Sequence, residues 1–195
     1  MYIVLEGIDG AGKSSQAKLL NEWLTKKGFK TKMIVEPTKS EIGKLIRKEL
    51  LNPESTNDIN QQMLTLLFAA DRLTLKKEII NSKNDGTILI SDRSFYSSIC
   101  YQNNSSVKSE WIYDVNTYTP RPDLTVILDL SEEEAIKRCD KEEVFENIDF
   151  LQKTRNNYLN LLKTENNIVI VDAGNSIDDV QQEIRKIVEK IVEEL

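Results

Sequence analysis

The chain has 195 residues, of which 39% are hydrophobic and 30% are charged, a composition typical of one ordinary globular domain. Its net charge of −6 argues against a protein that coats nucleic acid or an anionic membrane, because such proteins carry excess positive charge. The lack of histidine excludes Ser-His-Asp and Cys-His catalysis and every histidine-ligated metal site. We expect a single domain over residues 1–195 and, without a secretory leader, a cytoplasmic location.

Five short apolar segments, rich in β-branched residues, are typical of buried strands. In chain order, strands are predicted at residues 2–5, 31–35, 87–91, 124–128 and 168–171, and the main helices at residues 13–27, 42–51, 58–82 and 177–194. This alternation predicts an α/β fold with a five-stranded parallel sheet that helices cover on both faces. In such folds the ligand binds beyond the carboxyl ends of the strands.

The helix predicted at residues 58–82 is apolar on two sides. One stripe contains Ile59, Met63, Leu66, Ala70 and Leu73, and the other contains Leu64, Phe68, Leu75 and Ile79. A helix with two apolar stripes is expected to be buried on two sides. One side can face the sheet, and the other can face a partner subunit or a second layer of helices.

A phosphate-binding loop follows the first predicted strand. The pattern G-x-x-x-x-G-K-S lies between a strand and a helix, the context that this motif requires. Its backbone N–H groups can surround phosphates, Lys13 can reach the β- and γ-phosphates, and the Ser14 hydroxyl can bind Mg²⁺. The predicted ATP-binding residues of this loop are Gly7, Ile8, Asp9, Gly10, Ala11, Gly12, Lys13, Ser14 and Ser15. The sequence has no N-K-x-D guanine-reading motif, and the chain is too short for a motor or transporter ATPase, so a small kinase is favoured.

Four sequence blocks occur in the same order as in one protein family, and together they carry a resemblance that extends over the whole chain. They are LEGIDG at residues 5–10, LFAADR at residues 67–72, DR followed by SSICYQ at residues 92–102, and PRPDLT at residues 120–125. With them the chain resembles the thymidylate kinases, nucleoside monophosphate kinases with a three-layer P-loop kinase fold. The resemblance implies Mg²⁺-dependent transfer of the γ-phosphate of ATP to dTMP, giving dTDP and ADP, by a homodimer with no nucleic-acid or membrane partner.

Asp92 and Arg93 follow the third predicted strand and should emerge at the ligand edge of the sheet. A carboxylate there suits Mg²⁺, and a guanidinium suits a planar grip on phosphate. By resemblance, Arg93 bridges the donor and acceptor phosphates, and Asp9 contacts the 3′-hydroxyl of the acceptor. The catalytic set is therefore predicted as Lys13, Arg93, Asp92 and Asp9. The plainer alternatives are a structural Asp–Arg pair and an aspartate that only stabilises its loop.

Phe68 and Arg72 are four residues apart, so they share one face of the long helix. An aromatic ring beside a guanidinium suits a pyrimidine, with Phe68 stacking on the base and Arg72 donating to a base carbonyl. By resemblance, Ser98 reads the base edge, and Tyr101 packs against the sugar where a 2′-hydroxyl would clash. Phe68 as ordinary core remains an alternative. The full predicted acceptor set is Asp9, Arg47, Phe68, Arg72, Arg93, Ser98, Tyr101 and Gln102, with Arg47 as a second phosphate ligand by resemblance.

The chain departs from the family pattern at several positions. Ser94 stands where tyrosine or histidine is usual after Asp92-Arg93, and Gly10 stands where eukaryotic members often have arginine. The lid segment near residues 138–147 lacks the arginine-rich run of bacterial members. We expect Arg138 to stack on adenine and Lys141 to approach the phosphates, unless Lys141 is a solvated loop residue. Two other functions stay open, namely a kinase for another nucleoside monophosphate or a deoxynucleoside, and a nucleotide-binding protein without turnover.

Overall fold

The computed structural model describes residues 1–104, 106–138 and 148–193. Its centre is a five-stranded sheet with the strand order β2-β3-β1-β4-β5, and all four strand pairs are parallel. The strands are β1 (Tyr2–Glu6), β2 (Thr31–Val35), β3 (Ile88–Asp92), β4 (Leu124–Asp129) and β5 (Ile168–Asp172). The predicted parallel sheet is confirmed, and every predicted strand end lies within one residue of the observed end.

Within the described residues, the structure contains the four main helices predicted, a short helix that carries Ser98 and Tyr101, a helix that begins after Ser131, and two helices that were not predicted. The described helices are α1 (Lys13–Lys26), α2 (Glu41–Leu50), α3 (Asp58–Asn84), α4 (Phe95–Gln102), α5 (Ser109–Val115), α6 (Glu132–Arg138), α7 (Ile148–Leu161) and α8 (Ile177–Val192). The sequence analysis did not predict α5 and α7. Helix α5 has only seven residues, and the buried face of α7 includes the polar Thr154 beside Leu151 and Tyr158, so neither has a clear apolar stripe.

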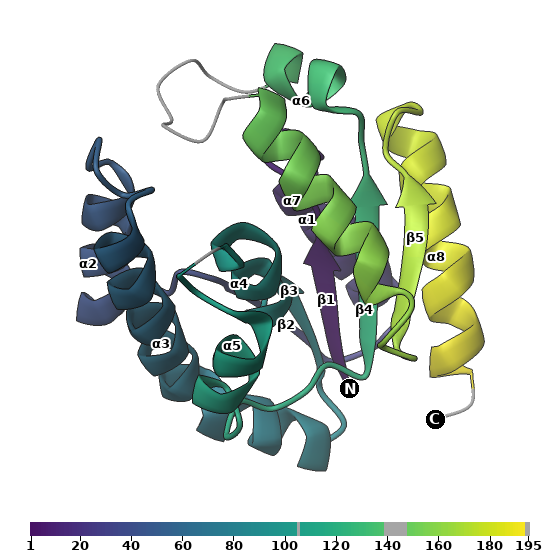
Figure 1. Ribbon diagram of the computed structural model, residues 1–195. Helices are drawn as coiled ribbons and strands as arrows, with labels where there is room; N and C mark the ends of the chain where they lie inside the picture. The colour runs from purple at the N-terminus through teal and green to yellow at the C-terminus, as the bar shows by residue number, and fades with distance from the viewer. Residues whose placement is uncertain (105, 139–147, 194–195) are drawn as a thin grey trace.

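The helices form a layer on each face of the sheet (Figure 1). Helices α1 and α8 pack against each other on one face, whereas α3, α4 and α7 cover the other, and α2 packs on α3. Strand β1 is buried along its whole length because it lies between β3 and β4 under both layers. Among the described residues, no helix combines the length and apolar character needed to cross a bilayer.

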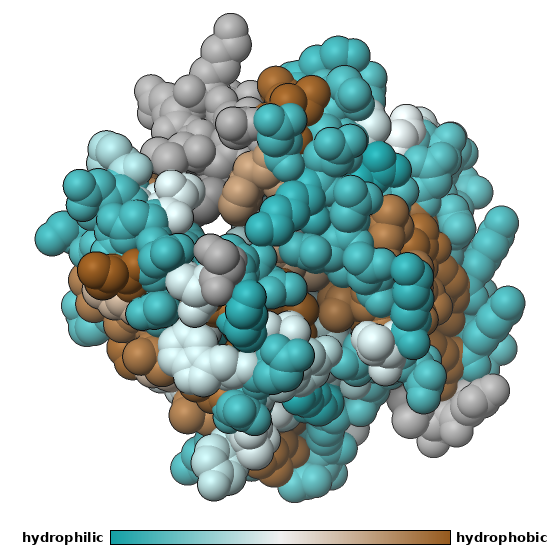
Figure 2. Space-filling view, in the orientation of Figure 1, coloured by the Kyte–Doolittle hydropathy of each residue, from teal (hydrophilic) through white to brown (hydrophobic). Residues whose placement is uncertain are grey.

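One face of α3 carries exposed apolar side chains. Ile59, Leu66, Leu73 and Ile80 are 77%, 51%, 42% and 43% exposed, and each lies seven residues after the last, so all four share one side of the helix. Leu64 and Ile79, from the other predicted stripe, are buried. Figure 2 shows hydrophobic atoms gathered over the edge of the molecule where Figure 1 draws α2 and α3.

Candidate active site

The phosphate-binding loop connects β1 to α1 at the carboxyl edge of the sheet. Two of its glycines are required by close packing. A Cβ at Gly7 would lie 2.6 Å from the Leu128 carbonyl oxygen, and one at Gly10 would lie 2.6 Å from the Ala135 carbonyl oxygen. Gly7 and Gly10 also have positive backbone φ angles, 141° and 80°, which residues with a Cβ rarely adopt. The loop therefore cannot take the arginine that eukaryotic members often carry at the Gly10 position without moving away from α6.

Lys13 is folded back onto this loop. Its Nζ atom donates to the Ile8 carbonyl oxygen at 2.7 Å and lies 3.9 Å from Asp9 Oδ1. Burial, with a further contribution from nearby Arg93, lowers the pKa of Lys13 to about 8. An incoming polyphosphate would offset both effects, because an anion next to an ammonium group favours its charged form.

Ser14 and Asp92 meet beside the loop. The Ser14 hydroxyl donates to Asp92 Oδ2, so the first turn of α1 contacts the last residue of β3. A hydroxyl and a carboxylate are the hard oxygen ligands that Mg²⁺ prefers, with water and phosphate completing its octahedron. Within the described residues, no group of three or more Asp, Glu, Cys or His side chains could hold a metal by themselves.

Two cavities flank the loop. The cavity on its α1 side has a volume of about 340 Å³ and is lined by Asp9, Gly10, Gly12, Lys13, Ser14, Ser15, Val35, Glu36, Asp92, Arg93 and Arg138. Most of the predicted ATP-binding residues are thereby brought together. Gly7, Ile8 and Ala11 do not line this cavity, and Lys141 lies outside the described residues. Arg138, at the end of α6, donates to the Ala173 carbonyl oxygen at 3.1 Å.

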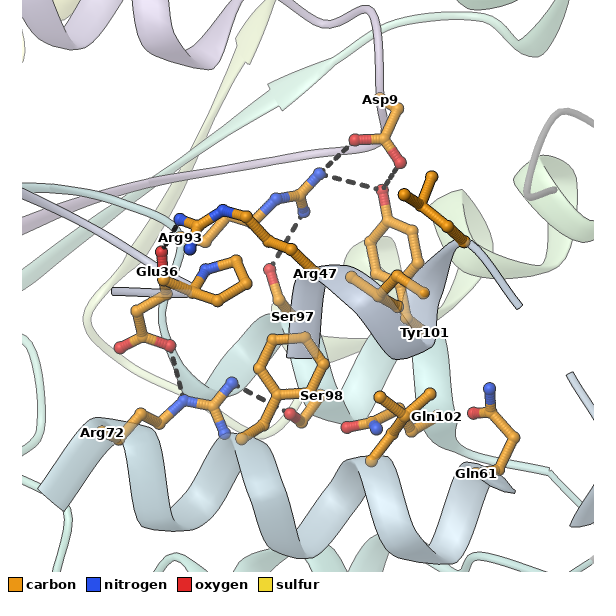
Figure 3. A pocket seen from close by; sticks show the side chains of 15 residues that line it. Asp9, Glu36, Arg47, Gln61, Arg72, Arg93, Ser97, Ser98, Tyr101 and Gln102 are labelled. Atoms are coloured by element: carbon orange, nitrogen blue, oxygen red, sulfur yellow. Dashed lines mark hydrogen bonds and ion pairs between the residues drawn. The ribbon is translucent and has the colours of Figure 1, made fainter. Parts of the chain in front are cut away.

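The second cavity has a volume of about 430 Å³ and lies between the loop, α2, α3 and α4 (Figure 3). All eight residues predicted to bind the acceptor line it: Asp9, Arg47, Phe68, Arg72, Arg93, Ser98, Tyr101 and Gln102. The sequence analysis missed seven further lining residues: Glu36, Pro37, Leu50, Leu51, Gln61, Leu64 and Ser97. Gln102 is 3% exposed, and its side-chain amide has no hydrogen-bond partner within the described protein.

Arg93 lies in the wall between the cavities. It adopts a left-handed backbone, with φ of 75°, which is unusual for a residue with a side chain. Its guanidinium donates to Asp9, to Ser97 Oγ at 3.1 Å and to the Tyr101 hydroxyl at 3.4 Å, as drawn in Figure 3. Burial alone would raise the pKa of Asp9, but Arg93 and Lys13 hold it below its usual value. The wall therefore carries charged side chains of both signs.

Arg72 is 1% exposed and is held by four hydrogen bonds. Its Nε donates to Glu36 at 2.6 Å, one terminal nitrogen donates to Asn116, and the other donates to Ser98 Oγ and the Ser94 carbonyl oxygen. Because a guanidinium has five N–H donors, one remains for a ligand. Burial raises the pKa of Glu36 to about 7 against the opposing effect of Arg72. Phe68 lies beside this group, with its ring centre 5.5 Å from the guanidinium carbon.

Arg47 is anchored to the segment that follows β2. It donates to the carbonyl oxygens of Pro37 and Thr38, the latter at 2.6 Å. Thr38 is fixed in turn by Asp71, whose carboxylate accepts from the Thr38 N–H at 2.7 Å and its hydroxyl at 2.6 Å. Helix α3 thus supplies Arg72 to the cavity and, through Asp71, holds the segment that orients Arg47.

The missed residues had unequal signals in the sequence. Glu36 directly follows β2 at the ligand edge of the sheet, so the same reasoning that selected Asp92 after β3 could have selected it. Ser97 belongs to the SSICYQ block and also could have been found. Leu50, Leu51 and Leu64 look like ordinary core or helix-end residues, and only the packing of α2 against α3 brings them to the cavity.

Comparison with known proteins decides which family this geometry represents. The family model for thymidylate kinase matches residues 5–184. The chain belongs to the thymidylate kinase family. The probable thymidylate kinase of Methanosphaera stadtmanae is 66% identical over 186 residues, with 95% of each chain covered. That of Pyrococcus horikoshii is 42% identical over 191 residues, with 94% of this chain and 93% of the relative covered.

The fold agrees with this membership. The structure of thymidylate kinase from Candida albicans superposes with a TM-score of 0.82 at 32% identity, covering 97% of this chain and 91% of the other. The protein is thus an enzyme that phosphorylates dTMP, as the sequence analysis predicted.

Proposed function

We propose that the 340 Å³ cavity holds the triphosphate of ATP and the 430 Å³ cavity holds dTMP, with phosphoryl transfer across the wall between them. The observation that supports this most is that Asp9, Glu36 and Arg93 line both cavities. Two anions that meet at this wall would be held in line by the protein, and their repulsion would be offset by fixed positive groups. No side-chain base is needed, because a phosphate monoester is already a nucleophilic anion.

On the donor side, the loop N–H groups and Lys13 would hold the β- and γ-phosphates. Ser14 and Asp92 would hold Mg²⁺, which supplies charge neutralisation between the β- and γ-phosphates when bound. Arg138 would stack on adenine, since its planar guanidinium suits a π-face, and Lys141 stays a proposed phosphate ligand. Residues 1–195 would form one domain, and the predicted lid near residues 138–147 lies, apart from Arg138, outside the described residues.

On the acceptor side, different residues would bind the base, the sugar and the phosphate of the nucleotide. Phe68 would stack on the base, and the fifth N–H of Arg72 would donate to a base carbonyl. The unpartnered amide of Gln102 and the Ser98 hydroxyl would complete recognition of the base edge. Arg47 and Arg93 would grip the phosphate from opposite sides, and Asp9 would accept from the 3′-hydroxyl. Because ATP and dTMP are intracellular metabolites, the proposal assigns the reaction to the cytoplasm.

An acceptor panel tests this assignment. ATP consumption with Mg²⁺ would be measured for dTMP, dUMP, UMP, CMP and thymidine at equal concentrations. We expect the highest kcat/KM with dTMP and none above background with thymidine, which lacks the phosphate that Arg47 and Arg93 are proposed to hold. Preferred use of CMP would contradict the proposed base contacts, because cytosine presents an amino group where Arg72 would donate.

Tyr101 should control the choice between deoxyribose and ribose. We expect Tyr101→Ala to raise the efficiency of ribo-TMP relative to dTMP by about tenfold, the size typical of a removed steric contact. Tyr101→Phe is the matched control, because it keeps the ring and loses only the hydroxyl that donates to Asp9 at 3.0 Å. Coupled kinetics with both acceptors give the ratio. The same ratio in wild type and Tyr101→Ala would remove the ring from sugar selection.

The exposed face of α3 is proposed as the interface of a homodimer. Ile59, Leu66, Leu73 and Ile80 form one stripe, and a two-fold axis across it would pair the stripe with its own copy, as in isologous interfaces. We expect wild type to be a dimer by light scattering and Leu66→Glu to be a monomer. Ile177→Glu, at a position on α8 that is also more than half exposed, should stay dimeric. A monomeric wild type at micromolar concentration would refute this interface.

A further inference from the structure

Glu6, the last residue of β1, has an unusual environment. It is fully buried, and its carboxylate accepts five hydrogen bonds. Oε1 accepts from the Ser94 N–H and hydroxyl, both at 2.8 Å, and from the Ser97 N–H at 3.2 Å. Oε2 accepts from the Ser97 hydroxyl at 2.7 Å and from the Tyr158 hydroxyl at 2.8 Å. An ionised carboxylate is costly to bury, and these five donors offset that cost.

The five donors come from the start of α4, including the residue before it, and from α7. Ser94 is the residue before α4, Ser97 is in its first turn, and Tyr158 belongs to α7. Glu6 itself directly precedes Gly7 and the phosphate-binding loop. One buried carboxylate therefore connects the donor loop with the start of the helix that supplies Ser98, Tyr101 and Gln102 to the acceptor cavity.

Two of the three arginines that line the acceptor cavity, Arg72 and Arg93, bind atoms of the segment that Glu6 holds. Arg93 donates to Ser97 Oγ at 3.1 Å, and Arg72 donates to the Ser94 carbonyl oxygen at 3.2 Å. The Ser97 hydroxyl has a single proton. Because Ser97 donates that proton to Glu6 Oε2, the lone pairs of Ser97 Oγ are left to face Arg93. Glu6 thus fixes the position of Ser97 and also ensures that Ser97 Oγ accepts the hydrogen bond from Arg93.

Position 94 supplies one side-chain donor of this arrangement. Ser94 stands where the family usually has tyrosine or histidine, and here its short hydroxyl donates to Glu6 Oε1 while its carbonyl oxygen accepts from Arg72. The departure from the family pattern noted in the sequence is therefore part of the same network.

We infer that Glu6 is a positioning residue for phosphoryl transfer: it holds Ser94 and Ser97 so that Arg72 and Arg93 keep their orientation toward the acceptor nucleotide. The inference rests on the proposed acceptor role of the 430 Å³ cavity. It differs from a purely structural role, in which Glu6 would cap α4 and its loss would lower thermal stability alone.

The test compares Glu6→Gln with Tyr158→Phe and Tyr96→Phe. Glutamine keeps the shape of Glu6, but it replaces one acceptor oxygen with an NH₂ donor that must face hydroxyl or N–H groups. Tyr158→Phe removes one of the five donors and leaves the carboxylate. Tyr96→Phe is the matched control, because Tyr96 is a buried residue of α4 whose hydroxyl bonds Glu165 and Asn167 instead.

At a temperature well below each Tm, we expect Glu6→Gln to raise the KM for dTMP and lower kcat, each by about tenfold or more, as displaced phosphate ligands do. The KM for ATP should change less than the KM for dTMP, since the loop N–H groups and Lys13 are not bound to Glu6 and only Arg93, which lines both cavities, would be displaced on the donor side. Tyr158→Phe should give a smaller change in the same direction, and Tyr96→Phe should leave both constants unchanged.

A double-mutant cycle supplies the decisive readout. Because Glu6 acts on Arg93 through Ser97, the effects of Glu6→Gln and Ser97→Ala on kcat should be less than additive. Wild-type kinetics in Glu6→Gln with only a lower Tm would overturn the inference while leaving the dTMP kinase assignment intact. If Glu6→Gln does not fold, unchanged dTMP kinetics in both Tyr158→Phe and Ser97→Ala would overturn it. Failure of wild type to use dTMP would instead refute the proposed function.

Discussion

Replacing Lys13 by alanine should lower kcat by about 10³-fold or more, the size expected when a charged group is removed from the transferring phosphoryl group. The Kd for dTMP should change by no more than a few fold, because Lys13 lines the donor cavity and not the acceptor cavity. Single-turnover kinetics and calorimetry with dTMP give the two quantities separately.

Lys18→Ala is the matched control for this experiment. Lys18 is an exposed residue of the same helix α1, so its loss changes the net charge equally without touching either cavity. We expect kcat and dTMP affinity like those of wild type. Loss of dTMP binding in parallel with activity in Lys13→Ala would show that Lys13 serves the acceptor or the folding of the loop.

Replacing Arg72 by methionine should destabilise the protein by about 3 kcal/mol or more at pH 8, because breaking a buried ion pair leaves an uncompensated charge. Glu36, its partner at 2.6 Å, is 4% exposed. Calorimetry should also find that dTMP binds at least tenfold more weakly, since the proposed donor to the base is gone. Urea unfolding measures the stability.

The stability lost in Arg72→Met should depend on pH in a definite direction. The folded-state pKa of Glu36, about 7, already lies above its ordinary 4.5, and removing Arg72 raises it further because the opposing positive charge is lost. Because the pKa of Glu36 is raised in the folded state, the contribution of this group to the free energy of unfolding is complete below pH 4.5. That contribution is lost as pH rises through the folded-state pKa. The variant should therefore keep losing stability above pH 7, and its deficit relative to wild type should be larger at pH 8 than at pH 6.

Two further variants separate stability from binding. Arg72→Met/Glu36→Gln removes both charges and should recover most of the lost stability, while dTMP binding stays weak. Lys44→Met breaks the exposed Lys44–Glu41 pair and should leave stability nearly unchanged. An Arg72→Met protein as stable as wild type at pH 8 would show that the Arg72–Glu36 pair does not stabilise the fold.

The features that could be predicted from the sequence are those determined by residues that lie close together along the chain. The strands are short β-branched runs, and the phosphate-binding loop is a contiguous motif, so both could be located to within a residue. Phe68 and Arg72 were assigned to one face from their spacing alone, and in the structure they lie in contact. The eight acceptor residues were gathered mainly because their blocks resemble a family.

The partners of these residues were not predictable. Arg72 was expected to serve the base, but four of its five donors bind protein groups, including Asn116 of the segment after α5. Glu6 appeared only as one letter of a motif, and its contacts reach Tyr158, 152 positions along the chain. Such contacts depend on how layers pack, and no spacing rule in a single sequence encodes them.

The strand order also has a consequence for synthesis on the ribosome. Strand β1 is made first, yet its neighbours in the sheet are β3 and β4, which end at residues 92 and 129. At roughly 5–20 residues per second, about 6–25 s pass between completion of β1 and completion of β4. Until β3 is complete, the apolar strand that leads into the nucleotide loop has no partner on either edge, and its second edge stays unpaired until β4 is complete. Nascent chains that stop between residues 20 and 90 should therefore bind a chaperone such as trigger factor or prefoldin more strongly than chains longer than 130 residues.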